Sequence, residues 1–125
     1  MNKYKLLFWI WLGIILTVSS IPGISTPKIS SLRFDLEIRL DYVFHLLEYL
    51  LLVFFFYKWK PDLKLSKILL AVVLFIVIAA VDEFHQMIVP GRVFNPNDLF
   101  YNVAGIMFGS VVTVLSIKRK QISRS

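Results

Sequence analysis

The chain has 125 residues, of which 58% are hydrophobic and 15% aromatic, with a formal net charge of +6 and no cysteine. An ordinary soluble domain is roughly 45–50% apolar. The excess here lies in long runs, which indicates one small integral membrane domain rather than a water-soluble core. The lack of cysteine excludes a disulfide scaffold, a thiolate metal site and cysteine-based catalysis.

Four apolar runs follow one another along the chain and predict an all-α bundle of four transmembrane helices. Each run is close to the roughly 17–25 residues that cross about 30 Å of hydrocarbon. The runs cover residues 6–21, 40–57, 65–89 and 99–117. The first run is the shortest and also has features of a cleaved signal peptide. Trp9 and Trp11 favour instead a retained helix that is anchored at the membrane interface.

The distribution of Lys and Arg predicts the orientation of these helices. Ten of the fourteen basic residues lie before the first run, around the connection between the second and third, or after the fourth. The other two loops contain only Lys28, Arg33, Arg39 and Arg92. The positive-inside rule therefore predicts a multi-pass cell-membrane protein with both termini in the cytoplasm. The basic residues then contact anionic membrane lipids, and no basic stripe with interleaved aromatic residues indicates a nucleic-acid partner.

The first outer loop contains an alternating segment at residues 32–40. Its even-numbered positions are apolar, whereas residues 33, 35, 37 and 39 are charged. A period of two predicts an extended amphipathic segment. Because a lone strand is not stable in water, we expect this segment to lie on the end of the bundle or to pair with residues 92–94. It could serve as a lid over the polar residues described next, or only fill the membrane interface.

Polar side chains gather at the ends of the last three runs, on the side that this topology places outside. Ionisable groups in a bilayer cost several kcal/mol unless they are paired or hydrated, so they usually face a bundle interior or a polar cavity. The helical period places them in three stripes. The stripes are Asp41, His45, Glu48 and Tyr49; Asp82, His85 and Gln86, with Glu83 about 100° to one side; and Asp98, Asn102, Gly105 and Gly109. The glycines permit close approach of a neighbouring helix.

We expect the three stripes to form one polar cavity that opens to the outer side of the membrane. In that arrangement His45 or Glu48 contacts Asp82 or His85. The alternative is that these side chains only join the helices, since interhelical polar pairs contribute on the order of 0.6 kcal/mol each. Ser or Thr would join helices at lower cost, which favours a functional site for these four residues together.

The connection between the third and fourth runs supplies two further expectations. Arg92 is the only cation of this short loop, so we expect it to fold back towards a neighbouring carboxylate of Asp82, Glu83 or Asp98. Asp98 follows an Asn-Pro-Asn segment at residues 95–97 and also suits the N-cap of the fourth helix.

The residue types in the stripes limit the chemistry. There is no His-Glu-x-x-His motif, and an i, i+3 Asp–His pair is a weak match to a metal site, so we predict neither a metal nor another cofactor. A His–carboxylate pair can act as a general acid and base, which makes His45, Glu48, Asp82 and His85 candidate catalytic residues for a lipid-linked or cell-wall substrate. The non-enzymatic alternative is a pocket that binds a glycopeptide, a lipid headgroup or the terminus of a cell-wall precursor. The candidate binding residues are Asp41, His45, Glu48, Tyr49, Asp82, Glu83, His85, Gln86, Arg92, Asp98 and Asn102.

These motifs, at their spacing and followed by Pro90, Gly91 and Arg92, resemble the VanZ-like family over roughly residues 35–115. The resemblance implies a small bacterial multi-pass membrane protein, in a family named for an accessory factor in resistance to the glycopeptide teicoplanin. Family members often have Lys directly after the first-motif Asp, where this chain has Tyr42, so Arg92 would have to supply a cation. We therefore expect an envelope protein that contributes to glycopeptide or envelope-stress tolerance through its polar cavity.

Overall fold

The structure is a computed structural model, which describes residues 1–22, 28–30 and 37–124. Within these residues the chain forms four α helices and one small antiparallel hairpin of two three-residue strands. In chain order the elements are α1 (Lys3–Ser19), β1 (Lys28–Ser30), β2 (Glu37–Arg39), α2 (Leu40–Trp59), α3 (Leu65–Gln86) and α4 (Pro96–Ile122). The helices form the predicted all-α bundle.

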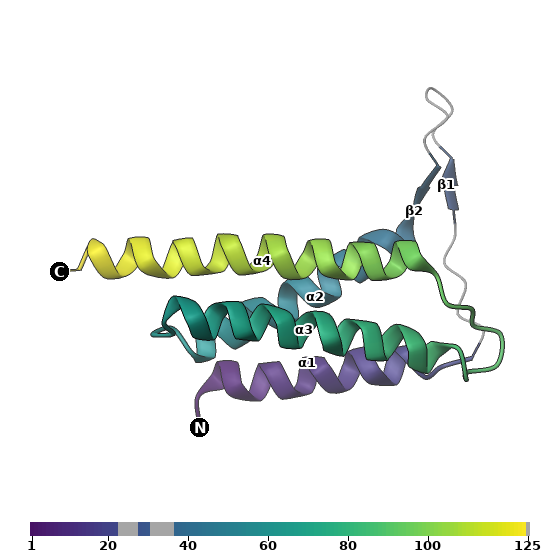
Figure 1. Cartoon of the computed structure of the whole chain (residues 1–125), viewed down its shortest axis with the longest axis horizontal. Helices are drawn as coiled ribbons and strands as arrows, with labels where there is room; N and C mark the ends of the chain where they lie inside the picture. Colours follow the sequence, from purple (N-terminus) through teal and green to yellow (C-terminus); the bar gives the residue numbers. More distant parts are fainter. Residues whose placement is uncertain (23–27, 31–36, 125) are drawn as a thin grey trace.

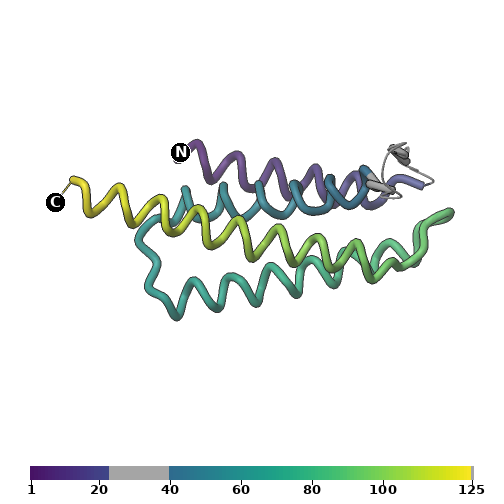
Figure 2. The backbone as a smooth tube through the Cα atoms, turned by 90° about the horizontal axis from the view of Figure 1, so that it is seen from above, coloured from purple at the N-terminus to yellow at the C-terminus, as the bar shows by residue number. Residues whose placement is uncertain are grey.

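The helices run alternately in opposite directions, which brings chemically distinct segments to the two ends of the bundle (Figures 1 and 2). Both chain termini and the α2–α3 connection lie at one end, which we call the basic end. The hairpin, the end of α1 and the α3–α4 connection lie at the other, which we call the polar end. All three predicted polar stripes are therefore at the same end of the molecule.

The lengths and surfaces of the helices fit a membrane protein. Helices α2, α3 and α4 have 20, 22 and 27 residues and are long and apolar enough to cross a membrane. Helix α1 has 17 residues, so it is about 25 Å long at 1.5 Å per residue and slightly shorter than a hydrocarbon core of about 30 Å. Leu69, Val73 and Val77 on α3 are each more than half exposed. Such large apolar side chains find suitable contacts in lipid.

The α2–α4 contact is the most extensive in the bundle and depends on two glycines of α4. A Cβ atom on Gly105 would overlap the carbonyl oxygen of Leu46, and a Cβ atom on Gly109 would lie 2.6 Å from Val53 Cγ2 and 3.1 Å from Leu50 Cα. The two helix backbones therefore touch where these residues lack side chains. This confirms the predicted role of the glycines in close helix packing.

Helix α4 begins earlier than the apolar pattern predicts because its first turn is capped by polar residues. The side chain of Asn95 accepts a hydrogen bond of 3.1 Å from the backbone N–H of Asn97, and Pro96 occupies the first helical position. The N-cap of α4 is thus Asn95, and the expectation that Asp98 would be the N-cap is wrong. Asp98 lies three residues further on, where its Oδ1 accepts a hydrogen bond of 3.0 Å from Asn95 Nδ2.

Helix α3 ends at Gln86, although the apolar sequence continues to Val89. The chain turns over residues 87–91 and reaches Gly91 with a φ of 78°, in the left-handed region that glycine adopts without steric cost. The residues that extended the apolar run therefore belong to a turn, not to another turn of helix.

The hairpin corrects one detail of the expected outer loop. Residues 37–39 are extended, as the alternating pattern predicts, but they pair antiparallel with residues 28–30 rather than with 92–94. Pairing within the same loop closes a shorter segment of chain, which costs less conformational entropy. Residues 32–36 of the predicted segment lie outside the described residues.

Candidate functional site

A fully buried carboxylate lies at the centre of the polar end. Glu83 of α3 is 0% exposed, and its Oε1 accepts a hydrogen bond of 3.1 Å from Nδ2 of Asn102 on α4. Its second oxygen, Oε2, is buried and has no hydrogen-bond partner in the structure. Burial of an ionisable group costs free energy unless its oxygens are satisfied, so this position is an expensive one for Glu.

His45 of α2 connects this carboxylate to a second one. Its Nδ1 lies 3.1 Å from Asn102 Oδ1; an amide oxygen only accepts hydrogen bonds, so Nδ1 carries the hydrogen. The same nitrogen is 3.8 Å from Glu83 Oε1, and Nε2 is 3.6 Å from Oδ2 of Asp98. Glu48, one helical turn from His45, places its Oε2 3.8 Å from Nδ1. We call His45, Glu48, Glu83, Asp98 and Asn102 the inner cluster.

The side chains of the inner cluster differ in their exposure. The side chain of Glu48 is 25% exposed, those of His45 and Asp98 are 14% and 12% exposed, and that of Glu83 is fully buried. Exposure thus decreases from Glu48 to Glu83.

Helix α1 forms a second polar contact with α3, which we call the α1 junction. Ser19 Oγ donates a hydrogen bond of 2.6 Å to Asp82 Oδ1, and both residues are buried. One residue further along α1, Ser20 Oγ lies 3.2 Å from Nε2 of His85, whose side chain is exposed. Asp82 and His85 therefore both make polar contacts with α1, and the carboxylate of Asp82 is also close enough to Glu48 and His45 to interact with them electrostatically.

Arg92 donates its hydrogen bonds to the end of α1 and to Gln86, and not to a carboxylate. Its Nη2 donates a hydrogen bond of 3.0 Å to the carbonyl of Val18, and its Nε donates one of 3.2 Å to the carbonyl of Ile21. Its Nη1 donates to Oε1 of Gln86 at 3.3 Å. Among the described residues Arg92 makes no hydrogen bond or ion pair with Asp82, Glu83 or Asp98, although its positive charge lies close enough to Glu83 to attract that carboxylate, in the expected direction. The carbonyl groups at a helix C-terminus lack intrahelical donors and carry partial negative charge, which explains why they attract the guanidinium.

The expected link between the second and third helices is present but runs through a different residue. The pattern singled out Asp82 and His85 as partners of His45 or Glu48. In the structure the short contact of His45 with α3 is with Glu83, which lies about 100° around the helix from Asp82. Helix α3 packs on α1 and on α4, so neighbouring positions of α3 face different helices. The sequence did not indicate that Ser19 and Ser20 take part in polar contacts, because small hydroxyl residues at the end of an apolar run are common. Their position next to the expected polar layer was the only available signal.

The other predicted residues lie around these groups. Asp41 is half-buried in the first turn of α2, where a carboxylate suits the positive end of the helix dipole. Tyr49 is fully buried about two turns further along. The hydroxyl of Tyr42 accepts a hydrogen bond of 3.2 Å from Asn97 Nδ2. Its ring stacks on Tyr101 with centroids 4.7 Å apart, which joins the first turns of α2 and α4.

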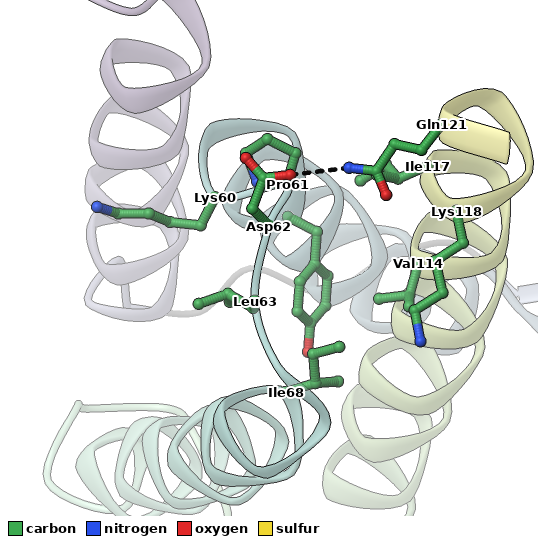
Figure 3. A pocket seen from close by; sticks show the side chains of 10 residues that line it. Lys60, Pro61, Asp62, Leu63, Ile68, Val114, Ile117, Lys118 and Gln121 are labelled. Atoms are coloured by element: carbon green, nitrogen blue, oxygen red, sulfur yellow. Dashed lines mark hydrogen bonds between the residues drawn. The ribbon is translucent and has the colours of Figure 1, made fainter. Parts of the chain in front are cut away.

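Direct contacts between side chains join the polar residues in both groups. Among residues 1–22, 28–30 and 37–124 no three His, Asp or Glu side chains are arranged to hold a metal ion. A pocket of about 230 Å³ lies elsewhere, at the basic end, between the α2–α3 connection and α4 (Figure 3).

The fold and the site define a small α-helical membrane protein with a buried His–carboxylate network at one end of its bundle. The chain belongs to the VanZ/LLP1 family, whose sequence pattern matches residues 5–117. This match confirms the resemblance and extends it over most of α1, where the sequence resembles the family only in its hydrophobic character. No curated protein and no solved structure is significantly similar to the chain.

Proposed function

We propose that this protein resides in the cell membrane with both termini in the cytoplasm. On the outer side, its inner cluster binds the polar part of a glycopeptide or of a lipid-linked or cell-wall ligand. Through this binding it contributes to tolerance of teicoplanin-type glycopeptides or of envelope stress. Membership of the VanZ/LLP1 family supports the general role, and the buried carboxylate of Glu83 is the observation that carries the proposal.

The argument from Glu83 is energetic. Asn102 satisfies one carboxylate oxygen, and the other is buried without a hydrogen-bond partner. An unsatisfied buried polar group costs roughly 1–3 kcal/mol and more when it is charged. Gln at this position would keep the shape and the contact with Asn102 and could not ionise. A residue that lowers stability in this way is understandable if its free oxygen accepts a hydrogen bond from a ligand.

The orientation follows from the charges at the two ends. Lys3, Lys5 and the basic residues of the α2–α3 connection and the C-terminal tail lie at the basic end. By the positive-inside rule this end faces the cytoplasm. The polar end then faces outward, where antibiotics and cell-wall precursors are found.

The experiment compares two acid-to-amide variants in a strain whose own copy of the gene is deleted. Glu83→Gln should abolish teicoplanin tolerance while membrane abundance stays normal and thermal stability stays equal or increases. The matched control is Asp62→Asn, which removes a carboxylate at the basic end and should leave tolerance intact. A Glu83→Gln protein that is abundant and fully protective would refute the proposal. A loss of tolerance in proportion to a loss of abundance would show that Glu83 is structural.

A membrane enzyme is the second candidate, and one observation favours it. The imidazole of His45 lies between the carboxylates of Asp98 and Glu83, at 3.6 Å and 3.8 Å, an arrangement suited to general acid–base catalysis. In this case His45→Gln should change the pool of lipid-linked cell-wall precursors measured by mass spectrometry. An unchanged pool in a strain with altered tolerance would favour binding without turnover.

A further inference from the structure

The pocket at the basic end lies far from the inner cluster and between different segments. It is enclosed by the last turn of α2, the α2–α3 connection, the start of α3 and the C-terminal part of α4 (Figure 3). Its volume is about 230 Å³, below the roughly 300–1,000 Å³ of sites that enclose a drug-sized ligand. It can therefore accommodate one segment of a larger molecule whose remainder stays outside.

The lining changes from apolar to charged along the helix axes. Ile68 and Val114 lie about one turn or more inside their helices, and Tyr57 lies in the last turn of α2. Tyr57 is 1% exposed, and its hydroxyl has no hydrogen-bond partner in the structure. Lys60 and Lys118 lie nearer the end of the bundle. A phospholipid at a membrane surface has the same order, with its acyl chains inward and its phosphate outward.

The charge at the rim favours an anionic partner. Asp62 is the acidic residue of the lining, and its Oδ1 already accepts a hydrogen bond of 2.8 Å from Gln121 Nε2. Lys60 and Lys118 stand on opposite walls and are both exposed (Figure 3). The ammonium of Lys60 points away from the pocket and lies 4.9 Å from the centroid of the Trp59 ring. A lysine has a long flexible stem, so both ammonium groups can turn towards a phosphate at the rim.

We propose that this pocket binds one anionic phospholipid. Its acyl segment lies along Ile68, Val114 and the neighbouring apolar lining, and its phosphate lies at the rim between Lys60 and Lys118. A free phosphate would make no use of the apolar part. This inference needs only a membrane protein and does not depend on the ligand of the inner cluster.

The test uses the full-length protein in detergent and counts bound lipid by native mass spectrometry. Dioleoylphosphatidylglycerol should bind with a stoichiometry of one and in preference to dioleoylphosphatidylcholine. The variant Lys60→Gln/Lys118→Gln should weaken this binding about 25-fold, or about fivefold for each lysine. The matched control is Lys64→Gln/Lys67→Gln, which removes the same charge from exposed positions at the N-cap and in the first turn of α3 and should weaken binding less than threefold.

Each other outcome overturns the proposal. Equal losses in the two double variants would mean a diffuse attraction of lipid to the basic end. Equal binding of the two lipids would mean that the phosphate charge is not recognised at the rim. If glycerol phosphate competes with phosphatidylglycerol at equal concentration, the site recognises a soluble phosphate and the acyl contact is wrong.

Discussion

Gly105 provides the most direct test of how the bundle is assembled. In Gly105→Ala the new Cβ atom would overlap the backbone oxygen of Leu46, which cannot rotate away as a side chain could. Helices α2 and α4 would have to separate. Overpacking costs typically 1–3 kcal/mol. Because the new methyl group of Gly105→Ala meets backbone atoms, which cannot move aside alone, we take the upper value of about 3 kcal/mol. Ala gains about 1 kcal/mol over Gly in helix propensity, so we expect a net loss of about 2 kcal/mol in the free energy of unfolding.

Gly13 of α1 is the matched control for this substitution. A Cβ atom there meets nothing within 4 Å, so Gly13→Ala should stabilise the protein by up to about 1 kcal/mol. The free energies of unfolding of the two variants, measured in mixed detergent micelles, should therefore differ by about 3 kcal/mol. Equal stabilities would refute the close contact between α2 and α4. Because Gly105 is one turn from Asn102, we also expect Gly105→Ala to disturb the inner cluster and to lower antibiotic tolerance.

Two further predictions concern orientation and the α1 junction. A cysteine at the exposed position Val93 should react with an impermeant reagent in intact cells, whereas one at Ser66 should react only after lysis; the reverse pattern would invert the proposed orientation. Ser19→Ala should lower the free energy of unfolding by about 1–3 kcal/mol because the buried carboxylate of Asp82 loses its donor. The double variant Ser19→Ala/Asp82→Asn should be less destabilised than the single one, and additive losses would show that the two side chains do not interact.

The periodic features of the sequence predicted the fold well because they are local. Apolar runs of spanning length defined the bundle, and the alternating topology placed the polar stripes at one end. Helical spacing also correctly put Gly105 and Gly109 against a neighbouring helix. Each of these conclusions follows from one segment or from the direction in which successive helices cross the membrane.

The partners of individual polar groups could not be predicted because they depend on how each helix is rotated. A rotation of α3 by about 100° decides whether Asp82 or Glu83 faces His45, and the residues of α3 alone do not fix that angle. The choice depends on α1, whose Ser19 binds Asp82 and whose terminal carbonyl groups bind Arg92. The pocket at the basic end could not be predicted from the sequence either, because its lining residues come from three helices and one connection.

The contacts of α3 also constrain the order in which the membrane protein can be completed. Asp82 finds its donor, Ser19, on a helix that is synthesised earlier, so this carboxylate can be satisfied as soon as α3 enters the bilayer. Glu83 finds its donor, Asn102, on α4, which is synthesised after α3. Until α4 inserts, the nascent chain carries an unsatisfied acidic group beside lipid, where such groups are costly. Arrival of α4 is thus the step that closes the bundle, and we expect a chain that stalls before it to be recognised by membrane proteases as incomplete.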